Sequence, residues 1–399
     1  NDGTNDEKKG DLLLEMQNLQ IEGRTEDEWL KIVNGVDVTL RRGEVLGLIG
    51  ESGAGKTTIG LAAMGFTRDG CRIAGGTIKF DGIDLVNASE KQRRALLGVR
   101  IAYVAQSAAA AFNPAHKLID QHSETPVEHG VLSTSEAEAD AKELYKQLRL
   151  PEPETIGFRY PHQVSGGQLQ RAMTAMALAC RPDLIIFDEP TTALDVTTQI
   201  EVLAAIKDVV EQFDAAAIYI SHDLALVAQM ADRIMVLRYG NLIEEGNTRD
   251  LLFHPKEEYT RDLLGVRSFR KASSKKESTE PPVLEVKNIT AAYGKTPVLI
   301  NVNVAVPLRR TVALVGESGS GKSTTARVIS GLLRPREGQI LWQGSPLPAD
   351  FRQRSKADLR KIQMIYQMPD TALNPKQRVR EAIGRPLAFY LDVLKFSYT

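Results

Sequence analysis

The sequence predicts an α/β fold that occurs twice in one chain, and three observations lead to this prediction. The same glycine-rich loop is present at residues 50–57 and 316–323, and both copies fit the pattern G-x-x-x-x-G-K-[ST]. A short apolar run, at 45–49 and 312–315, precedes each loop and suits a buried strand, and a segment that suits a helix follows it. Segments on both sides of the loop also recur in the same order. A strand, a phosphate-binding loop and a helix in this order are the context that the motif requires.

Both loops carry the residue types that hold phosphate groups. Glycines let backbone N–H groups close around phosphate oxygens at a helix N-terminus, where the helix dipole favours anions. Lys56 and Lys322 are expected to reach the β- and γ-phosphates of a nucleoside triphosphate, and Thr57 and Ser323 are expected to bind Mg²⁺. The candidate phosphate-binding residues of the first copy are Gly50, Glu51, Ser52, Gly53, Ala54, Gly55, Lys56, Thr57 and Thr58. Those of the second copy are Gly316, Glu317, Ser318, Gly319, Ser320, Gly321, Lys322, Ser323 and Thr324. A chance glycine-rich turn could account for one such loop but not for two in matching contexts.

Composition limits the classes of protein to which the chain can belong. Its 399 residues suit two or three domains. A net charge of −1 gives no electrostatic case for binding nucleic acid. Cys71 and Cys180 form neither a disulfide framework nor a zinc site, and they favour a reducing cytosol. The sequence has no run of about 18 apolar residues, so we expect no membrane span. The polar N-terminus is not a signal peptide, and because it lacks Met we expect a trimmed or partial chain.

The repeat spans whole domains, because the two loop lysines, Lys56 and Lys322, lie much further apart than the units of a solenoid protein. Matched segments flank the loops and predict short antiparallel strands: 12–19 with 283–289, 34–38 with 300–304, and 78–82 with 340–344. A segment rich in Ser, Lys, Arg and Glu separates the copies and ends in two prolines, which indicates an exposed linker. Its basic residues are interpreted as a solvated tether rather than a binding patch. The predicted domains are a disordered N-terminus at 1–10, a complete first domain at 11–265, the linker at 266–282 and an incomplete second domain at 283–399.

A second apolar run in the first copy ends in two carboxylates. Residues 184–187 suit a buried strand, and Asp188 and Glu189 follow at once. Asp188 is placed to support Mg²⁺, and Glu189 is placed to polarise an attacking water. A strand that merely ends in a polar turn is the alternative, but the position of Asp188 relative to Lys56 along the chain and the following Pro190 argue against it.

Ser165, Gly166, Gly167 and Gln168 open a helical run at 169–180. Serine and glycines at a helix N-terminus can bind an anion, or Ser165 can be a simple N-cap. The run Val164–Gln168, which precedes the strand that ends at Asp188, resembles the signature of ATP-binding-cassette (ABC) ATPases. Other elements of that family occur in the expected order, and they are the Q-loop glutamines Gln106 and Gln367, the D-loop Ala193-Leu194-Asp195, and the switch histidine His222 after a strand at 217–221. The resemblance covers residues 11–265 and 283–386.

The resemblance implies roles for these residues. Glu189, His222 and Gln106 are expected to be catalytic, and Gln106 and Gln367 are also expected at the metal. The residues expected at a bound nucleotide, besides the loops, are Ser165, Gly166, Gly167, Gln168, Asp195, Gln367 and Tyr293. ABC cassettes pair head to tail, so the signature of one completes the ATP site of the other. The implied fold is a phosphate-loop α/β core with an antiparallel β subdomain and a helical subdomain, duplicated.

The second copy is expected to be incomplete. Projection from Gln367 with the spacing of the first copy puts a second signature near 426 and a second carboxylate pair near 449, beyond Thr399. We therefore expect a sequence that is cut short rather than a cassette of half the usual size.

Two features resemble a particular group within the family. Asn113-Pro114 and Asn374-Pro375 follow the two Q-loop glutamines at the same spacing, and the run 254–264 reads HPKEEYTRDLL. Both resemble the ATPases of dipeptide, oligopeptide and nickel importers that fuse two cassettes. The implied cofactors are ATP and Mg²⁺, and the implied partners are two membrane permease subunits and an extracytoplasmic solute-binding protein. The implied location is the cytoplasmic face of the inner membrane. The transported solute stays open, as does a second interpretation as a soluble tandem ABC ATPase acting on ribosomes or nucleic acid.

The aromatic residue that stacks on adenine in this family is expected to be Tyr293, which precedes the second loop. If the offset between Lys56 and Lys322 is constant, the equivalent of Tyr293 in the first copy is Asp27, and Trp29 lies just beyond it. Trp29 is therefore either the adenine platform of that copy or an ordinary packing residue.

Overall fold

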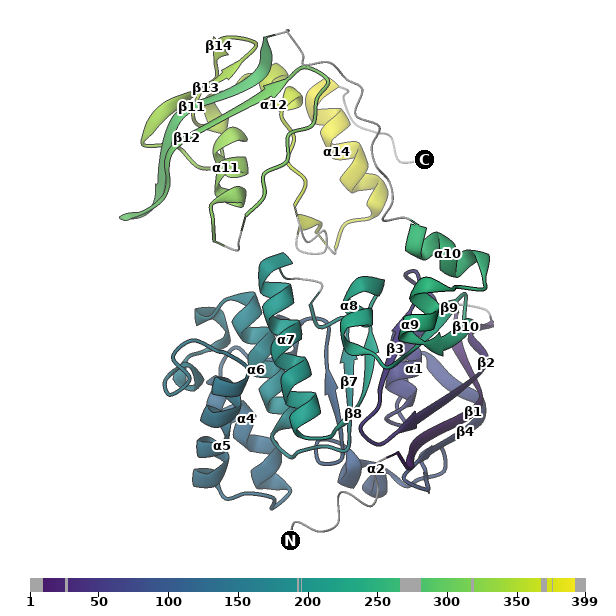
Figure 1. Ribbon diagram of the computed structural model, residues 1–399. Coiled ribbons are helices and arrows are strands. Elements are labelled where there is room, and N and C mark those ends of the chain that lie inside the picture. The colour runs from purple at the N-terminus through teal and green to yellow at the C-terminus, as the bar shows by residue number, and fades with distance from the viewer. Residues whose placement is uncertain are drawn as a thin grey trace. The chain divides into compact units, whose positions relative to one another are not determined.

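The computed structural model describes residues 10–25, 28–191, 194, 196–265, 281–316, 319–366, 372–374 and 376–391. The chain divides into two compact units, 1–271 and 272–399, and the division falls inside the segment that we expected to be a linker. Figure 1 follows the chain from purple at the N-terminus to yellow at the C-terminus.

An antiparallel sheet begins the first unit. Its strands are β1 (Leu12–Arg24), β2 (Trp29–Arg41), β4 (Cys71–Phe80) and β5 (Ile83–Asp84), in the order β2-β1-β4-β5. Inward-facing side chains such as Leu14 and Met16 are fully buried, and polar residues alternate with them where one face is solvated. The strands predicted at 12–19, 34–38 and 78–82 lie in this sheet, although β4 ends at Phe80, where a turn begins.

A six-stranded sheet forms the centre of the first unit, in the order β10-β9-β3-β8-β7-β6. Its strands are β3 (Val45–Ile49), β6 (Ile101–Val104), β7 (Leu184–Asp188), β8 (Ala216–Ile220), β9 (Arg233–Arg238) and β10 (Asn241–Asn247). All pairs are parallel except β9 with β10. Every residue of β3, β7 and β8 is buried, as expected for parallel strands covered on both faces. The predicted α/β fold is confirmed in this unit.

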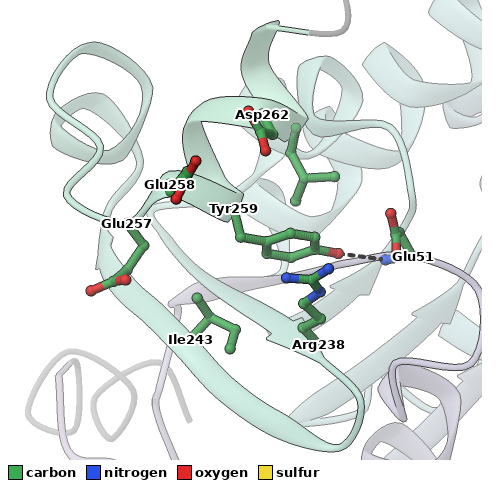
Figure 2. Close-up of a pocket in the computed structure, with 8 residues that line it drawn as sticks. Glu51, Arg238, Ile243, Glu257, Glu258, Tyr259 and Asp262 are labelled. Carbon is green, nitrogen blue, oxygen red and sulfur yellow. Dashed lines mark hydrogen bonds between the residues drawn. The ribbon is translucent and has the colours of Figure 1, made fainter.

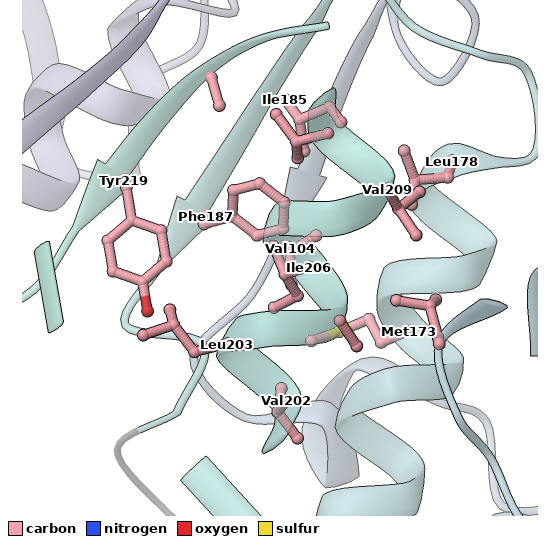
Figure 3. Packing of buried hydrophobic residues seen from close by; sticks show 14 of the residues in the cluster. Val104, Met173, Leu178, Ile185, Phe187, Val202, Leu203, Ile206, Val209 and Tyr219 are labelled. Carbon is pink, nitrogen blue, oxygen red and sulfur yellow. The ribbon is translucent and has the colours of Figure 1, made fainter. Parts of the chain in front are cut away.

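Helices and the antiparallel sheet cover the two faces of this central sheet (Figure 1). On one face α6 (Gly166–Leu178) and α7 (Val196–Gln212) pack on the strands. Figure 3 shows Phe187 and Tyr219 from the strands beside Val202, Leu203 and Ile206 of α7. On the other face Leu46 and Leu48 of β3 share a core with the antiparallel sheet. The predicted helix at 169–180 is present as α6, which begins earlier because Ser165 caps it and which ends at Leu178.

The remaining helices among the described residues of the first unit are mostly short. They are α1 (Lys56–Ala62), α2 (Glu90–Leu96), α3 (Ala108–Ala111), α4 (Leu118–Glu128), α5 (Thr134–Gln147), η2 (Ile156–Phe158), η3 (Pro161–Gln163), α8 (Leu224–Met230), α9 (Thr248–Phe253) and α10 (Glu258–Gly265). Helices α3 to α6 pack on one another and form a helical layer.

The second unit repeats the antiparallel sheet. Its strands are β11 (Pro282–Tyr293), β12 (Thr296–Pro307), β13 (Glu337–Trp342) and β14 (Ser345–Pro346), in the equivalent order β12-β11-β13-β14. Its described helices are α11 (Lys322–Ile329), η5 (Phe351–Gln353), α12 (Lys356–Lys361) and α14 (Val379–Leu391).

The prediction of a buried strand at 312–315 is wrong. This segment has no strand structure, and Leu314 and Val315 are 44% and 89% exposed. The equivalent β3 of the first unit has β8 on one side and β9 on the other. Among the described residues of the second unit no strand pairs with 312–315, so this apolar run has no neighbour to complete its hydrogen bonds.

Candidate nucleotide-binding site

The loop between β3 and α1 has a conformation that its glycines permit. Gly50 has a φ of 152°, and a Cβ there would lie 2.1 Å from the carbonyl oxygen of Leu237, so a larger residue does not fit. Gly55 has a φ of 94° and is the N-cap of α1. The loop is thereby fixed so that it leads directly into the helix that starts at Lys56.

Lys56 is buried inside this loop. Its Nζ donates hydrogen bonds to the carbonyl oxygens of Gly50, at 2.8 Å, and of Glu51, at 3.0 Å. Burial lowers the pKa of Lys56, while the charges of Glu189 and Asp188 act in the opposite direction. The ammonium group is therefore held at the mouth of the loop by backbone oxygens.

Asp188 ends β7 and receives two hydrogen bonds from different elements. The hydroxyl of Thr57 donates to its Oδ1 at 2.9 Å, and the hydroxyl of Tyr103 donates to its Oδ2 at 2.7 Å. Burial, followed by this bond to Asp188, raises the pKa of Tyr103, so the phenol stays a neutral donor. Tyr103 was not predicted from the sequence. It lies on β6, and the pairing of this strand with β7 places it beside Asp188.

Glu189, Gln106 and His222 meet at one carboxylate oxygen. Glu189 follows β7 with a φ of 48°, and Oε2 of its carboxylate lies 3.4 Å from Nε2 of Gln106 and 3.3 Å from Nδ1 of His222. Since β7 and β8 are parallel neighbours, the residues that follow them emerge at the same edge of the sheet. The side chain of His222 is 56% exposed, which leaves it accessible to a ligand.

A cavity of about 540 Å³ opens around the loop. Its lining residues are Ile32, Ser52, Gly53, Ala54, Gly55, Lys56, Thr57, Thr58, Arg68, Gln106, Glu189 and His222. The structure thus brings most of the predicted phosphate-loop residues together with three predicted catalytic residues. Arg68, an exposed residue in the loop after α1, was not predicted, and no motif marks it.

The predicted signature residues do not line this cavity. Ser165 is the N-cap of α6, where its hydroxyl accepts from the N–H of Gln168 at 3.3 Å and its own N–H donates to Oε1 of Gln168 at 2.9 Å. A Cβ on Gly167 would lie 2.6 Å from Cγ2 of Thr198, so this glycine lets α6 and α7 pack closely. A Cβ on Gly166 would meet nothing within 4 Å, so the backbone there is open. Asp195 lies outside the described residues.

The loop of the second unit repeats the first in its main features. Gly321 is the N-cap of α11 with a φ of 93°, and Nζ of Lys322 donates to the carbonyl oxygen of Gly316 at 2.7 Å. Ser323 is exposed and Thr324 is buried. The predicted residues Glu317, Ser318 and Gln367 lie outside the described residues, while Gly319 and Ser320 are described within the loop.

Strand pairing corrects the expected equivalent of Tyr293. Met16 of β1 pairs with Ile78, and Val286 of β11 pairs with Ile340 in the same way, so Met16 and Val286 are equivalent. At the same distance further along each strand lie Gly23 and Tyr293, so Tyr293 corresponds to Gly23 and not to Asp27. The constant offset failed because the hairpin after β1 is longer than the hairpin after β11. Asp27 lies outside the described residues.

The two predicted aromatic residues have different surroundings. Tyr293 accepts a hydrogen bond from Nη1 of Arg327, on the helix that follows the second loop, at 3.0 Å. Trp29 lies at the start of β2 and does not line the nucleotide cavity; the guanidinium of Arg72 lies 4.1 Å from the centre of its ring. The first unit therefore has a glycine where the second has Tyr293.

Comparison with known proteins agrees with this geometry. The family model described as ABC transporter matches residues 33–192 and 299–395. The glutathione import ATP-binding protein GsiA of Shigella dysenteriae serotype 1 is 33% identical over an alignment 428 residues long, gaps included. The alignment covers 96% of this chain and 68% of the relative. GsiA of Escherichia coli strain K12 is 33% identical with the same coverage.

Solved structures share the fold. A dimeric ATP-binding cassette in a post-hydrolysis state with ADP and phosphate superposes with a TM-score of 0.54 and 24% identity, covering 59% of this chain and 99% of that one. An ATP-binding subunit of an ABC transporter has a TM-score of 0.51 and 25% identity, covering 63% and 97%. Within the part of the chain that the structure describes, no helix has the length and apolar character needed to cross a membrane. The chain belongs to the ABC transporter family, and it is an ATPase of the ABC type.

Proposed function

We propose that this chain binds and hydrolyses ATP to energise an importer of peptides or related small solutes, acting through separate permease subunits. Relatives that share a third of its residues are named as glutathione import ATP-binding proteins, which supports an importer of this class. The observation that carries the proposal is the meeting of Lys56, Thr57 and the Asp188–Glu189 pair at one edge of the central sheet.

The first step is the binding of the triphosphate by the loop. Lys56 would keep its bond to the carbonyl of Gly50 and donate its other two N–H groups to the β- and γ-phosphates, and the N–H groups at the start of α1 would hold the remaining phosphate oxygens. Because Lys56 is buried, its charge would act in surroundings where water screens it little.

The side chains around Asp188 suit Mg²⁺. Thr57 and Asp188 offer two oxygen ligands side by side, and this ion binds oxygen and keeps several waters and phosphates around it. No cluster of three His, Cys, Asp or Glu side chains that could hold a metal occurs among the described residues, which agrees with an ion completed by phosphate and water rather than by protein alone. When bound, Mg²⁺ would neutralise charge on the phosphates. Gln106 would also approach it, and Ser323 and Gln367 are proposed for the equivalent role in the second copy.

Glu189 is proposed to orient the attacking water. Gln106 and His222 both lie within 3.4 Å of its Oε2, so they restrict how the carboxylate can turn. The carboxylate held in this way lines the nucleotide cavity, where it would accept a proton from water, and the exposed His222 would meet the γ-phosphate there.

A complete site is proposed to need a second cassette, which would contribute Ser165, Gly166, Gly167, Gln168 and Asp195. The exposure of Gly166 supports this, because a Cβ built on it would meet nothing within 4 Å among the residues that the structure describes. The pairing can occur within a chain or between chains.

Domain limits and assembly follow as proposals. The limits are a first cassette at 11–265, a linker at 266–282 and part of a second cassette from 283, with Tyr293 as its adenine-stacking residue. The partners are two permease subunits and a solute-binding protein, and the place of action is the cytoplasmic face of the inner membrane. Residues 107–164, which hold helices α3 to α5 of the helical layer, are proposed to contact the permeases.

The test is reconstitution with the permease subunits encoded by the neighbouring genes. Co-purification with them, and ATP hydrolysis that a loaded solute-binding protein stimulates, are the expected results. The Glu189→Gln variant should co-purify equally but show no stimulated hydrolysis. Co-sedimentation with ribosomes and no association with the permeases would refute the proposal.

A further inference from the structure

The run 254–264, which marks the subfamily, ends in a helix that is fastened to the central sheet. The carboxylate of Glu244, on β10, accepts hydrogen bonds from the N–H groups of Lys256, at 2.8 Å, and Glu257, at 3.1 Å, just before α10 begins. Leu263 and Leu264 of α10 pack against the main core. The start of the helix is therefore held in a defined place.

Tyr259 is the residue of this helix that reaches the phosphate loop. Its ring lies 4.5 Å from the guanidinium carbon of Arg238, and its hydroxyl accepts a hydrogen bond of 3.3 Å from the backbone N–H of Glu51 (Figure 2). Tyr259, Arg238 and Glu51 line a cavity of about 540 Å³ beside the loop. The residues that line this cavity differ from those that line the nucleotide cavity. The hydroxyl thus contacts the loop from outside the nucleotide site.

The group that Tyr259 contacts is the same peptide that holds Lys56. The carbonyl of Gly50 and the N–H of Glu51 belong to one peptide bond, and in a planar trans peptide they point in opposite directions. None of the described residues has a cis peptide. Nζ of Lys56 donates to that carbonyl at 2.8 Å, and the hydroxyl of Tyr259 accepts from that N–H. The peptide is therefore held from both ends, by the loop's own lysine and by α10.

We propose that Tyr259 is a positioning residue for the first phosphate loop. By fixing the plane of the Gly50–Glu51 peptide, its hydroxyl sets where the carbonyl holds Lys56, and so where the ammonium group meets the phosphates. This rests on the proposed role of Lys56 in nucleotide binding. It gives the subfamily motif a function at the ATP site, although the motif lies far from the loop in sequence.

The experiment measures Mg²⁺-dependent binding of trinitrophenyl-ADP to the full chain, with Lys322→Ala in every variant to remove binding at the second loop. The trinitrophenyl group adds contacts of its own, which keeps weak binding measurable. Tyr259→Phe removes only the hydroxyl and keeps the ring over Arg238. Tyr239→Phe is the matched control, because Tyr239 is 71% exposed and its ring also lies near Arg238, at 5.2 Å.

Tyr259→Phe should raise the Kd about two- to tenfold, the range expected for one hydrogen bond, while the melting temperature stays unchanged. Tyr239→Phe should change neither. In a Lys56→Ala background, Tyr259→Phe should have no further effect, because its influence passes through Lys56.

The outcomes separate this inference from the proposed function. If Lys56→Ala binds as tightly as its parent, the proposed function fails. If Lys56→Ala weakens binding and Tyr259→Phe does not, the proposed function stands and the inference is overturned. An equal loss from Tyr259→Phe in both backgrounds would also overturn it, since the hydroxyl would then act independently of Lys56.

Discussion

The hydroxyl of Thr57 donates a hydrogen bond of 2.9 Å to Oδ1 of Asp188, although the two residues are far apart in sequence. Thr57 lies on the helix after β3 and Asp188 ends β7, and β8 lies between these two strands in the sheet. The contact therefore depends on three parallel strands ending at one edge. It joins the loop that would bind phosphate to the carboxylates that would bind metal and activate water.

Replacement of Lys56 by alanine is expected to abolish binding of a nonhydrolysable ATP analogue at the first loop. No other side chain of that loop supplies a cation for the β- and γ-phosphates. Calorimetric titration of the full chain carrying Lys322→Ala checks this, with Lys207→Ala as the control, because Lys207 lies on α7 and pairs with Glu211. Undiminished binding in the Lys56→Ala variant would show that the loop is wrongly assigned.

Replacement of Glu189 by glutamine is expected to preserve ATP binding and slow hydrolysis about 10²- to 10⁴-fold. Glutamine keeps the shape and can still contact Gln106 and His222, but it loses the charge that orients water. Single-turnover hydrolysis by the reconstituted transporter measures the effect. The exposed Glu211→Gln serves as control, and an unchanged rate for Glu189→Gln would contradict the proposed role.

Replacement of Tyr103 by phenylalanine is expected to raise the Mg²⁺ concentration needed for half-maximal hydrolysis about two- to tenfold. The change removes the 2.7 Å hydrogen bond to Oδ2 of Asp188 and leaves this buried carboxylate less well oriented. A magnesium titration at saturating ATP gives the value, with Tyr239→Phe as the control. If the magnesium dependence of Tyr103→Phe matches the parent, Asp188 does not rely on this bond.

The stability of the first unit is expected to fall in acid because of His122. This residue of α4 packs against Tyr145, and burial lowers its pKa to about 4, with Asp140 opposing the shift and Arg181 adding to it. The unfolded chain takes up a proton near pH 6.5, so between pH 6.5 and 4 the unfolded state binds more protons and stability decreases as pH falls. The full loss, reached below about pH 4, is about 3 kcal/mol.

Urea unfolding of the full chain from pH 7 to 4.5 tests this, followed by a signal from the first unit. His122→Phe should flatten the pH dependence in that window. His129→Phe, at the exposed end of the same helix, should leave it as in the parent. Equal pH dependence in the parent and His122→Phe would exclude His122 as the cause.

Features set by neighbouring residues could be predicted from the sequence. The loop at 50–57 needs only its glycines and the helix that follows, because they fix the backbone and supply N–H groups locally. The N-cap at Ser165, one of the two interpretations of that residue, is also a local feature, whereas the predicted strand before Asp188 formed because β8 and β6 pair with it on either side. The site residues themselves stay predictions until they are tested by mutation.

Features that depend on distant partners were decided by the tertiary structure. The run 312–315 is as apolar as β3 but forms no strand, because a central strand needs neighbours on both sides and apolar composition cannot supply them. The pairing register moved the equivalent of Tyr293 from Asp27 to Gly23. Tyr103 and Tyr259 carry no local mark, because what places their hydroxyls at Asp188 and Glu51 is the packing of strand and helix in space.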